Sequence, residues 1–309
     1  MLPLPLARAI LHLCYRLTFH HRVPWSVQRT LLNTVARLQP LPPGTSVVPL
    51  RLGTRPAERV SAGAAGGTGA VLYLHGGGYT VGSPRTHRSL AAHLSREVRR
   101  PVYLLDYRLA PEHPCPAAVD DTTAAYEALA AAEGHALDTI VIAGDSAGGG
   151  IALAATQQLG PGKRPAALVL ISPWTNPAEV ADRHRDLVVN RPWGLACAAA
   201  YLGAGDSSDP RYAPQSGVLT GLPPTYLHTN SRELLYSQCR GLAASLRRAG
   251  VPLRYVESPV LWHAAQAQAG LVRAAAASVR DIGDFLTAVW SGRPTHLFEA
   301  VFPERDVSS

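Results

Sequence analysis

Ser146 lies in the segment GDSAG, residues 144–148, where the residue types and their spacing suit covalent catalysis. An apolar run typical of a strand precedes it, and an Ala- and Gly-rich stretch typical of a helix follows. A serine on such a turn takes an unfavourable backbone conformation, tolerable because Gly144 and Gly148 let strand and helix come close. The turn lifts the hydroxyl clear of the backbone, above the first helical amides. We therefore predict that Ser146 is a nucleophile; the alternative is a turn that only reverses the chain or holds a phosphate.

A second motif, LHGGGY at residues 74–79, carries three successive glycines directly after an apolar run. Their bare backbone N–H groups can donate to the oxyanion that forms when a nucleophile attacks a carbonyl. We predict that Gly76 and Gly77, joined by the amide of Ala147, form this oxyanion hole. The alternative is a flexible glycine loop without chemistry.

Apolar runs alternate with helix-like stretches along most of the chain, which predicts an α/β protein. Near-continuous apolar runs are typical of strands buried on both faces, and strand–helix alternation favours a mostly parallel sheet with helices on both faces. The expected strands are residues 70–75, 101–107, 139–144, 167–172, 224–229 and 252–257.

Two regions depart from this rhythm and are expected to cover one end of the sheet. Residues 1–45 look helical and end in the loop QPLPPGTS, and residues 175–220 are longer than a simple crossover needs. We therefore expect an N-terminal cap segment at 1–45 and a catalytic domain at 46–309 with a cap insertion at about 175–220.

Composition narrows the class of protein and its partners. The 309 residues are 47% hydrophobic and 17% charged, as in a globular protein. The net charge of +7 comes almost wholly from arginines scattered along the chain, which argues against nucleic-acid binding. Four cysteines far apart indicate reduced thiols, no metal site and a cytoplasmic location. Arginines interrupt the apolar N-terminal stretch, so we expect an amphipathic helix without stable membrane insertion.

Together with these motifs, YRLAPEHPCPAAVDD (107–121) and LISPW (170–174) resemble the hormone-sensitive-lipase-like family of esterases. The resemblance spans about residues 65–290. It implies an α/β-hydrolase fold with a helical cap and hydrolysis of small carboxylic esters with short to medium acyl chains. No cofactor or metal is implied, and whether the chain forms a homodimer stays open. In such esterases Arg108 and Asp121, with their neighbours Glu112 and Asp120, would be structural supports rather than catalytic groups.

His263 is the predicted general base, because a serine needs a group that accepts its proton. In the implied fold the chain order is Ser, acid, His. Only His263 follows the last expected strand at the edge where the turn of Ser146 points, and its segment PVLWHAAQ occupies the place of the family's PGMWHxF. The other histidines after Ser146 lie in the cap insertion, in a strand or in the tail, at His184, His228 and His296.

The acid is where the sequence departs from the family. Related esterases carry DPLRDEG or SDEVLLDD in this region, and here the segment reads SRELLYSQ, with Arg232 in place of the aspartate of the second form. The family's spacing to Gly250 and to His263 points to Glu233 as the acid; the alternative is a charge that only complements a helix N-terminus. Less well placed are Glu257, Asp182, Asp186, Asp206 and Asp209.

These residues predict an ester hydrolase with a Ser146–Glu233–His263 triad. A non-catalytic small-molecule receptor on the same fold is disfavoured because nucleophile, base and oxyanion glycines are all present. An amidase or lactonase would use the same groups, since the pocket and not the triad sets specificity. Tyr79 and Trp174 are the candidate pocket residues.

Overall fold

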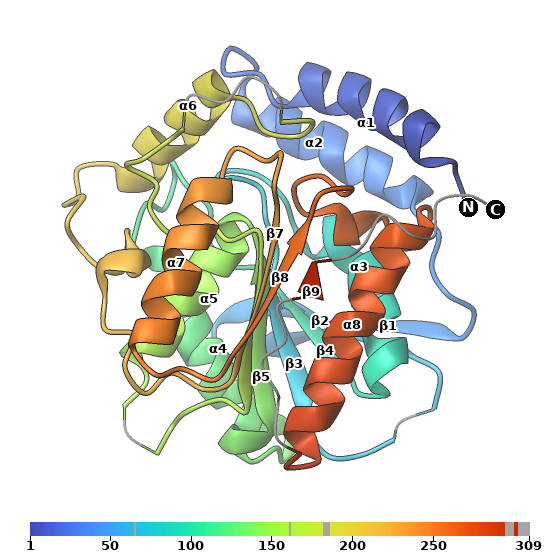
Figure 1. The fold of residues 1–309 in the computed structure, drawn as a ribbon, viewed down its shortest axis with the longest axis vertical. Coiled ribbons are helices and arrows are strands. Elements are labelled where there is room, and N and C mark those ends of the chain that lie inside the picture. Colours follow the sequence, from blue (N-terminus) through green and yellow to red (C-terminus); the bar gives the residue numbers. More distant parts are fainter. Residues whose placement is uncertain (65, 161, 182–185, 294–299, 302–309) are drawn as a thin grey trace.

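A computed structural model places a central sheet between two helical layers, with further helices across one end (Figure 1). It describes residues 1–64, 66–160, 162–181, 186–293 and 300–301.

All six expected strands are present, and each ends within two residues of its predicted limits. They form a parallel run in which almost every residue is buried, and β3, β4 and β6 are wholly apolar, as is typical of strands covered on both faces. They are β3 (Ala70–Leu74), β4 (Val102–Leu105), β5 (Ile140–Asp145), β6 (Ala167–Ile171), β7 (Thr225–Asn230) and β8 (Leu253–Ser258).

Three further strands, not predicted, complete the sheet. β1 (Thr45–Leu52) and β2 (Arg55–Ala62) form an antiparallel hairpin, and β9 (Ala300–Val301) runs parallel to β8. In β1 and β2, arginines and Glu58 interrupt the apolar residues, as is typical of antiparallel strands with one face exposed to water, so no continuous apolar run marks them. In the described residues the strand order is β1-β2-β4-β3-β5-β6-β7-β8-β9. This is the predicted α/β-hydrolase architecture.

Helices cover both faces of the sheet (Figure 1). The pair α3 (Pro84–Val98) and α8 (Arg273–Trp290) packs on one face, and α4 (Ala117–Glu133), α5 (Ala147–Gln158) and α7 (Tyr236–Arg248) lie on the other. Short 3-10 turns are η1 (Ala36–Leu38), η2 (Leu137–Thr139), η3 (Pro214–Ser216) and η4 (Ala265–Gln268). None of the helices in the described chain is both long and apolar enough to cross a membrane.

Three helices from distant parts of the sequence lie across the top of the sheet in Figure 1: α1 (Leu4–Thr18), α2 (Trp25–Val35) and α6 (Arg191–Leu202). The ring of Phe19 stacks on Trp193 with centroids 4.4 Å apart. The indole N–H of Trp193 donates to Gln28 at 2.9 Å. Residues 1–45 and the insertion therefore pack against each other, although their division from a catalytic domain stays a prediction.

Gln28 offers a test of this packing, because its fully buried side chain donates to the carbonyl of Val23 at 2.7 Å and accepts from Trp193. We expect Gln28→Leu to lower the free energy of unfolding by about 1–3 kcal/mol, since a buried N–H and a buried carbonyl lose their partner. Urea unfolding measures the change, with the exposed Ser26→Ala on the same helix as control. Equal stability of both variants would show that this contact contributes nothing.

Candidate active site

Ser146 occupies the sharp turn between β5 and α5 in the strained conformation that the sequence predicts, with φ 52° and ψ −122°. Its own N–H donates to the carbonyl of Ile171 at 2.9 Å, and its carbonyl accepts from the N–H of Trp174 at 2.8 Å. These bonds to the neighbouring strand end hold a backbone geometry that isolated serine avoids. The N–H of Ala147 opens α5, where first-turn amides have no intrahelical partner.

Glycines on both sides of Ser146 permit a close approach of backbones. A Cβ on Gly148 would lie 2.1 Å from the carbonyl oxygen of Leu74, at the end of β3. A Cβ on Gly144 would lie 2.4 Å from the carbonyl oxygen of Gly148. The start of α5 therefore packs directly on the end of β3, which brings Ser146 beside the glycine loop.

The glycine loop differs from the prediction at one residue. The N–H of Gly76 donates to the Asp145 carboxylate at 3.1 Å, so it is not free to bind an oxyanion as predicted. Gly77 and Gly78 line the cavity that holds Ser146, and no group in the described residues accepts a hydrogen bond from their N–H groups. Gly78, which the sequence analysis did not select, is therefore available beside Gly77.

Asp145 explains the correction at Gly76. Its buried carboxylate also accepts from the Tyr73 hydroxyl at 3.0 Å and contacts Nε2 of His87 at 3.1 Å. Burial by itself would raise the pKa of Asp145, but His87 and the Tyr73 hydrogen bond lower it below its ordinary value. The ionised Asp145 carboxylate thus fixes Gly76, the first glycine of the loop, through its N–H. The role of Asp145 was not predicted from the sequence, although a carboxyl next to Ser146 was a signal.

His75 and the segment after β4 support the same loop. Burial lowers the pKa of His75 to about 3, so its ring is neutral, and Nδ1 lies 2.9 Å from the Gly76 carbonyl, to which it can donate. The hydroxyl of Tyr107 donates to the His75 carbonyl at 2.6 Å. Next to Tyr107, the Arg108 guanidinium binds the Asp121 carboxylate at 2.8 Å, which ties this segment to α4 as the family resemblance implied.

Glu233 and His263 meet as a buried hydrogen-bonded pair, with Oε2 3.2 Å from Nδ1. The hydroxyl of Thr229 donates to the other carboxylate oxygen at 2.6 Å. Burial alone would raise the pKa of Glu233, but the hydrogen bond and charge of His263 bring it below its ordinary value. Burial alone would lower the pKa of His263, but Glu233 raises it above its ordinary value. The pair therefore favours an ionised carboxylate that orients the ring through Nδ1–H.

The other ring nitrogen, Nε2 of His263, is buried, and no group in the described residues hydrogen-bonds it. The hydroxyl of Ser146 is thus not bonded to it either, but both residues line one cavity of about 260 Å³. Catalytic hydrogen bonds of this type often tighten only when substrate binds. Nε2 is therefore an unused acceptor in the cavity that contains the strained serine.

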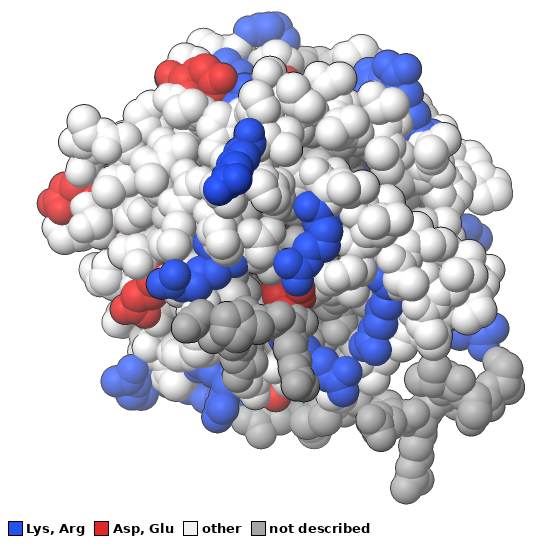
Figure 2. All heavy atoms as spheres, turned by 90° about the horizontal axis from the view of Figure 1, so that it is seen from above, with Lys and Arg blue, Asp and Glu red and all other residues white. Residues whose placement is uncertain are grey.

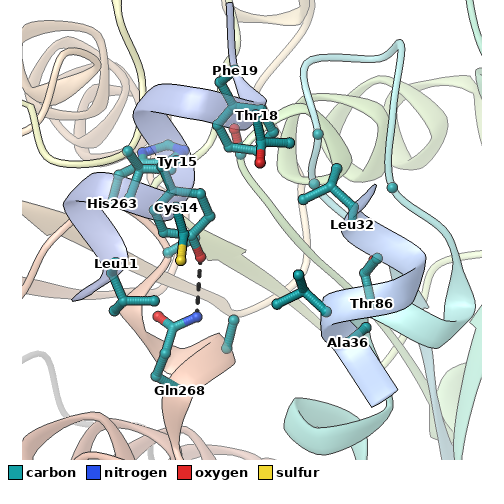
Figure 3. Close-up of a pocket in the computed structure, with 18 of the residues that line it drawn as sticks. Leu11, Cys14, Tyr15, Thr18, Phe19, Leu32, Ala36, Thr86, His263 and Gln268 are labelled. Carbon is teal, nitrogen blue, oxygen red and sulfur yellow. Dashed lines mark hydrogen bonds between the residues drawn. The ribbon is translucent and has the colours of Figure 1, made fainter. Parts of the chain in front are cut away.

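The first two helices form the wall opposite the sheet (Figure 3). Leu11 and Tyr15 of α1 lie on one side of the cavity, and Leu32 of α2 lies on the other, with Ala36 just beyond the end of α2. The hydroxyl of Tyr15 accepts a hydrogen bond from Gln268 at 3.2 Å, which joins α1 to the loop after His263. The lining is mostly apolar, as a site for an alkyl or acyl group requires.

Tyr79 and Trp174, which we predicted as pocket residues, are not among the residues that line this cavity. Both are almost fully buried; the Tyr79 hydroxyl donates to the Trp174 carbonyl at 2.6 Å, and its ring stacks on Tyr201. Tyr79 has a positive φ (65°), and its hydroxyl lies beside Gly150 in the first turn of α5. The N–H of Trp174 in turn donates to the Ser146 carbonyl, so these aromatics support the turn.

The remaining candidate histidines and carboxylates make other contacts or lie outside the described residues. His228 is fully buried in β7, where burial lowers its pKa to about 4. Glu257 accepts from the Tyr236 hydroxyl at 2.6 Å. His184, His296 and Asp182 lie outside the described residues. In the described parts of the chain no three His, Cys, Asp or Glu side chains gather as a metal site needs.

Asp186 lies in the insertion, and we predicted no role for it. It links that insertion to the loop that carries Glu233. Its buried carboxylate accepts from the N–H groups of Val188 at 2.8 Å, Val189 at 3.0 Å and Leu234 at 2.7 Å. Leu234 follows Glu233 directly, so Asp186 fixes the backbone that carries Glu233. Nothing in the sequence around Asp186 signals this contact.

A mostly parallel sheet, a strained serine after a central strand and a histidine–carboxylate pair at the same edge define the α/β-hydrolase class. A family model described as alpha/beta hydrolase fold matches residues 71–267. The chain belongs to this family and, within it, to the hormone-sensitive-lipase-like esterases.

Similar proteins agree with this placement. Esterase LipU of Mycobacterium tuberculosis is 34% identical over 286 residues, covering 86% of this chain and 94% of the relative. An acetyl-hydrolase of Streptomyces hygroscopicus is 39% identical over 200 residues, covering 62% and 67%. The crystal structure of an esterase from the bacterial hormone-sensitive lipase family superposes with a TM-score of 0.84 at 34% identity, covering 93% and 99%. The chain is thus a carboxylic ester hydrolase.

The close approach at Gly148 gives a prediction. Gly148→Ala would place a methyl group against a strand carbonyl that cannot move, so we expect loss of nearly all esterase activity and a lower Tm. Gly160→Ala, just beyond the same helix and in open space, is the matched control. Activity on p-nitrophenyl acetate and thermal unfolding measure both. A fully active Gly148→Ala enzyme would mean that the turn does not need this contact.

Proposed function

We propose that this esterase hydrolyses short- to medium-chain carboxylic esters through an acyl-enzyme intermediate, with Ser146, His263 and Glu233 as its triad. The observation that carries the proposal is the buried Glu233–His263 hydrogen bond, whose free Nε2 belongs to the cavity of the strained serine. A serine hydroxyl at its ordinary pKa is a poor nucleophile, and such a base makes it reactive.

In the proposed acylation, Nε2 of His263 accepts the Ser146 proton as the oxygen attacks the ester carbonyl. The C–O bond to the alcohol then breaks, and the imidazolium returns the proton to the leaving alkoxide. Deacylation repeats the sequence with water, which His263 deprotonates, and releases the acid and the free serine. Glu233 stays ionised throughout and stabilises the imidazolium of each step.

The tetrahedral oxyanion would be bound by backbone N–H groups of Gly77, Gly78 and Ala147. Gly76 is not among these donors, because its N–H donates to the Asp145 carboxylate. Gly77 and Gly78 lie where their φ values are 125° and 59°, a left-handed geometry that favours glycine. Each such donor is worth roughly 3 kcal/mol in the transition state.

The cavity supports a preference for small acyl groups. Its volume of about 260 Å³ lies just below the roughly 300–1,000 Å³ of typical ligand pockets, and its walls are mostly apolar. We place residues 1–45 and about 175–220 in one cap over a catalytic domain at 46–309, because α1, α2 and α6 pack together above the cavity. A receptor without catalysis fits less well, since a paired base serves no purpose in simple binding.

The nucleophile is tested with p-nitrophenyl esters from acetate to palmitate. We expect turnover to be highest for short and medium acyl chains, and Ser146→Ala to lose at least about 10⁴-fold in kcat. Amide and lactone substrates assayed in parallel separate the related activities. If Ser146→Ala still hydrolysed every ester that the wild type hydrolyses, another residue would be the nucleophile. If the wild type hydrolysed none of the esters, a receptor would be favoured.

The acid is tested by the pH dependence of kcat/KM. His263 acts as a base only when neutral, so the rate falls as pH drops through its pKa, which lies above the ordinary value of about 6.5. In Glu233→Gln the carboxylate no longer stabilises the imidazolium, so this limb shifts to lower pH while kcat falls by about 10³–10⁴-fold. Glu257→Gln, on a carboxylate away from the cavity, should change neither. An unshifted limb in Glu233→Gln would contradict the assignment.

A further inference from the structure

Exposed apolar side chains are concentrated on the first two helices. Of the large apolar side chains that are exposed in the described chain, all but Val48, Leu195 and Val218 lie within residues 1–41. On α1 they recur at Leu6, Ile10, Leu13 and Leu17, and along α2 and η1 at Val27, Leu31, Val35 and Leu38. Both sets have the spacing of a single helical stripe. Leu13 and Leu17 are 63% and 66% exposed, so nothing in the described chain covers them.

The residues of these exposed stripes are not the ones with which the helices pack against the protein interior. In α1 the inner face is formed by Leu4, Ala7, Leu11 and Tyr15, which face the cavity or pack near the loop after His263. α1 is therefore apolar toward the protein and apolar toward its outside. A surface helix of a globular protein is normally polar on the outer side, and a large exposed apolar patch marks an interaction site.

The outer stripes border the entrance of the catalytic cavity. Ile10 of α1, Leu31 and Val35 of α2, and Leu38 of η1 are exposed and also line that cavity. The apolar surface outside is thus continuous with the apolar lining inside. Any surface that covers the stripes would face the opening above Ser146.

The charged side chains of the segment that carries the stripes are all basic. No Asp or Glu occurs before Glu58, whereas Arg8, Arg16, Arg22, Arg29 and Arg37 lie in the first two helices and their connections. Arg29 pairs with Glu112, and Arg16, Arg22 and Arg37 are exposed. Figure 2 looks onto this end of the molecule and shows a mostly uncharged face on which basic side chains outnumber acidic ones.

We propose that the outer faces of α1, α2 and η1 dock the protein on an anionic lipid surface, with the cavity entrance against the lipid. An apolar stripe flanked by arginines is what an interfacial helix presents to lipid headgroups and acyl chains. The helices lie on the surface and do not cross it. Delivery of water-insoluble esters to Ser146 through this contact rests on the proposed function; the docking does not.

A second copy of the chain fits the same surface less well. A two-fold dimer would place identical patches face to face, so each arginine-rich border would oppose another with no acidic residue among the first 57 to compensate. Anionic headgroups supply that missing negative charge.

Flotation with vesicles tests the docking in the Ser146→Ala background, which keeps lipid hydrolysis out of the measurement. Phosphatidylcholine vesicles that contain phosphatidylglycerol should bind the protein, and raised salt should weaken binding. Leu13→Ser with Leu17→Ser should lower the partition coefficient roughly tenfold for each leucine, since neither lines the cavity and both would be buried in lipid. Arg16→Gln with Arg37→Gln should lower it roughly fivefold for each charge.

Val218→Ser, the matched control, removes an exposed apolar side chain outside both helices and should leave binding unchanged. Thermal unfolding checks that each variant is folded. Equal binding of the leucine variant and its parent would overturn the proposal, and so would equal binding to phosphatidylcholine alone. Sedimentation velocity adds a third criterion: a dimer that the leucine substitutions convert to a monomer would assign the surface to a second copy and overturn lipid docking.

Discussion

The close contact between the start of α5 and the end of β3 is the constraint on which the site depends. A serine with φ 52° costs on the order of 1–3 kcal/mol and persists only where its surroundings enforce it. Here the carbonyl of Ile171 at the end of β6 and the N–H of Trp174 just after it both hydrogen-bond the backbone of Ser146. Because Gly148 has no side chain, the start of α5 can also pack directly on the end of β3. Because the strands are parallel, the loops after β3, β5, β7 and β8 emerge at one edge. Groups far apart in the chain therefore meet without any long loop.

Buried carboxylates then fix these loops relative to one another. Asp145 holds the glycine loop, Glu233 holds the ring of His263, and Asp186 holds the backbone next to Glu233. Each carboxylate accepts several hydrogen bonds, because a buried charge without them would be strongly unfavourable. Burial raises the pKa of Asp186, whereas hydrogen-bonded partners keep the pKa of Asp145 and Glu233 low. The site is thus positioned by a connected polar network under an apolar cavity.

The features of the fold and of the site that depend on a local sequence pattern could be predicted from the sequence. The apolar runs specified six strands, and the spacing of glycines around Ser146 specified the turn, because a strained backbone needs glycine whatever surrounds it. Which N–H is free is a tertiary property: Gly76 and Gly77 are alike in sequence, and only the position of Asp145 separates them. Likewise Tyr79 follows the glycine loop, but its hydroxyl bonds the Trp174 carbonyl 95 residues away, a contact that leaves no local pattern. The contact of Asp186 with Leu234 joins segments 48 residues apart and leaves no local pattern.

The contrast between α1 and α8 shows that not every surface helix of this chain has an apolar outer side. α8 also has an apolar inner face, formed by Ala275, Val279, Ile282 and Leu286, but its outer side carries Arg280, Asp284 and Thr287 at helical spacing. That arrangement is expected of a helix with water on one side. At the equivalent outer spacing α1 carries four large aliphatic residues. One chain thus contains both patterns, so its overall apolar composition does not explain the difference. The outer stripe of α1 instead reflects an environment other than water at the entrance to the cavity.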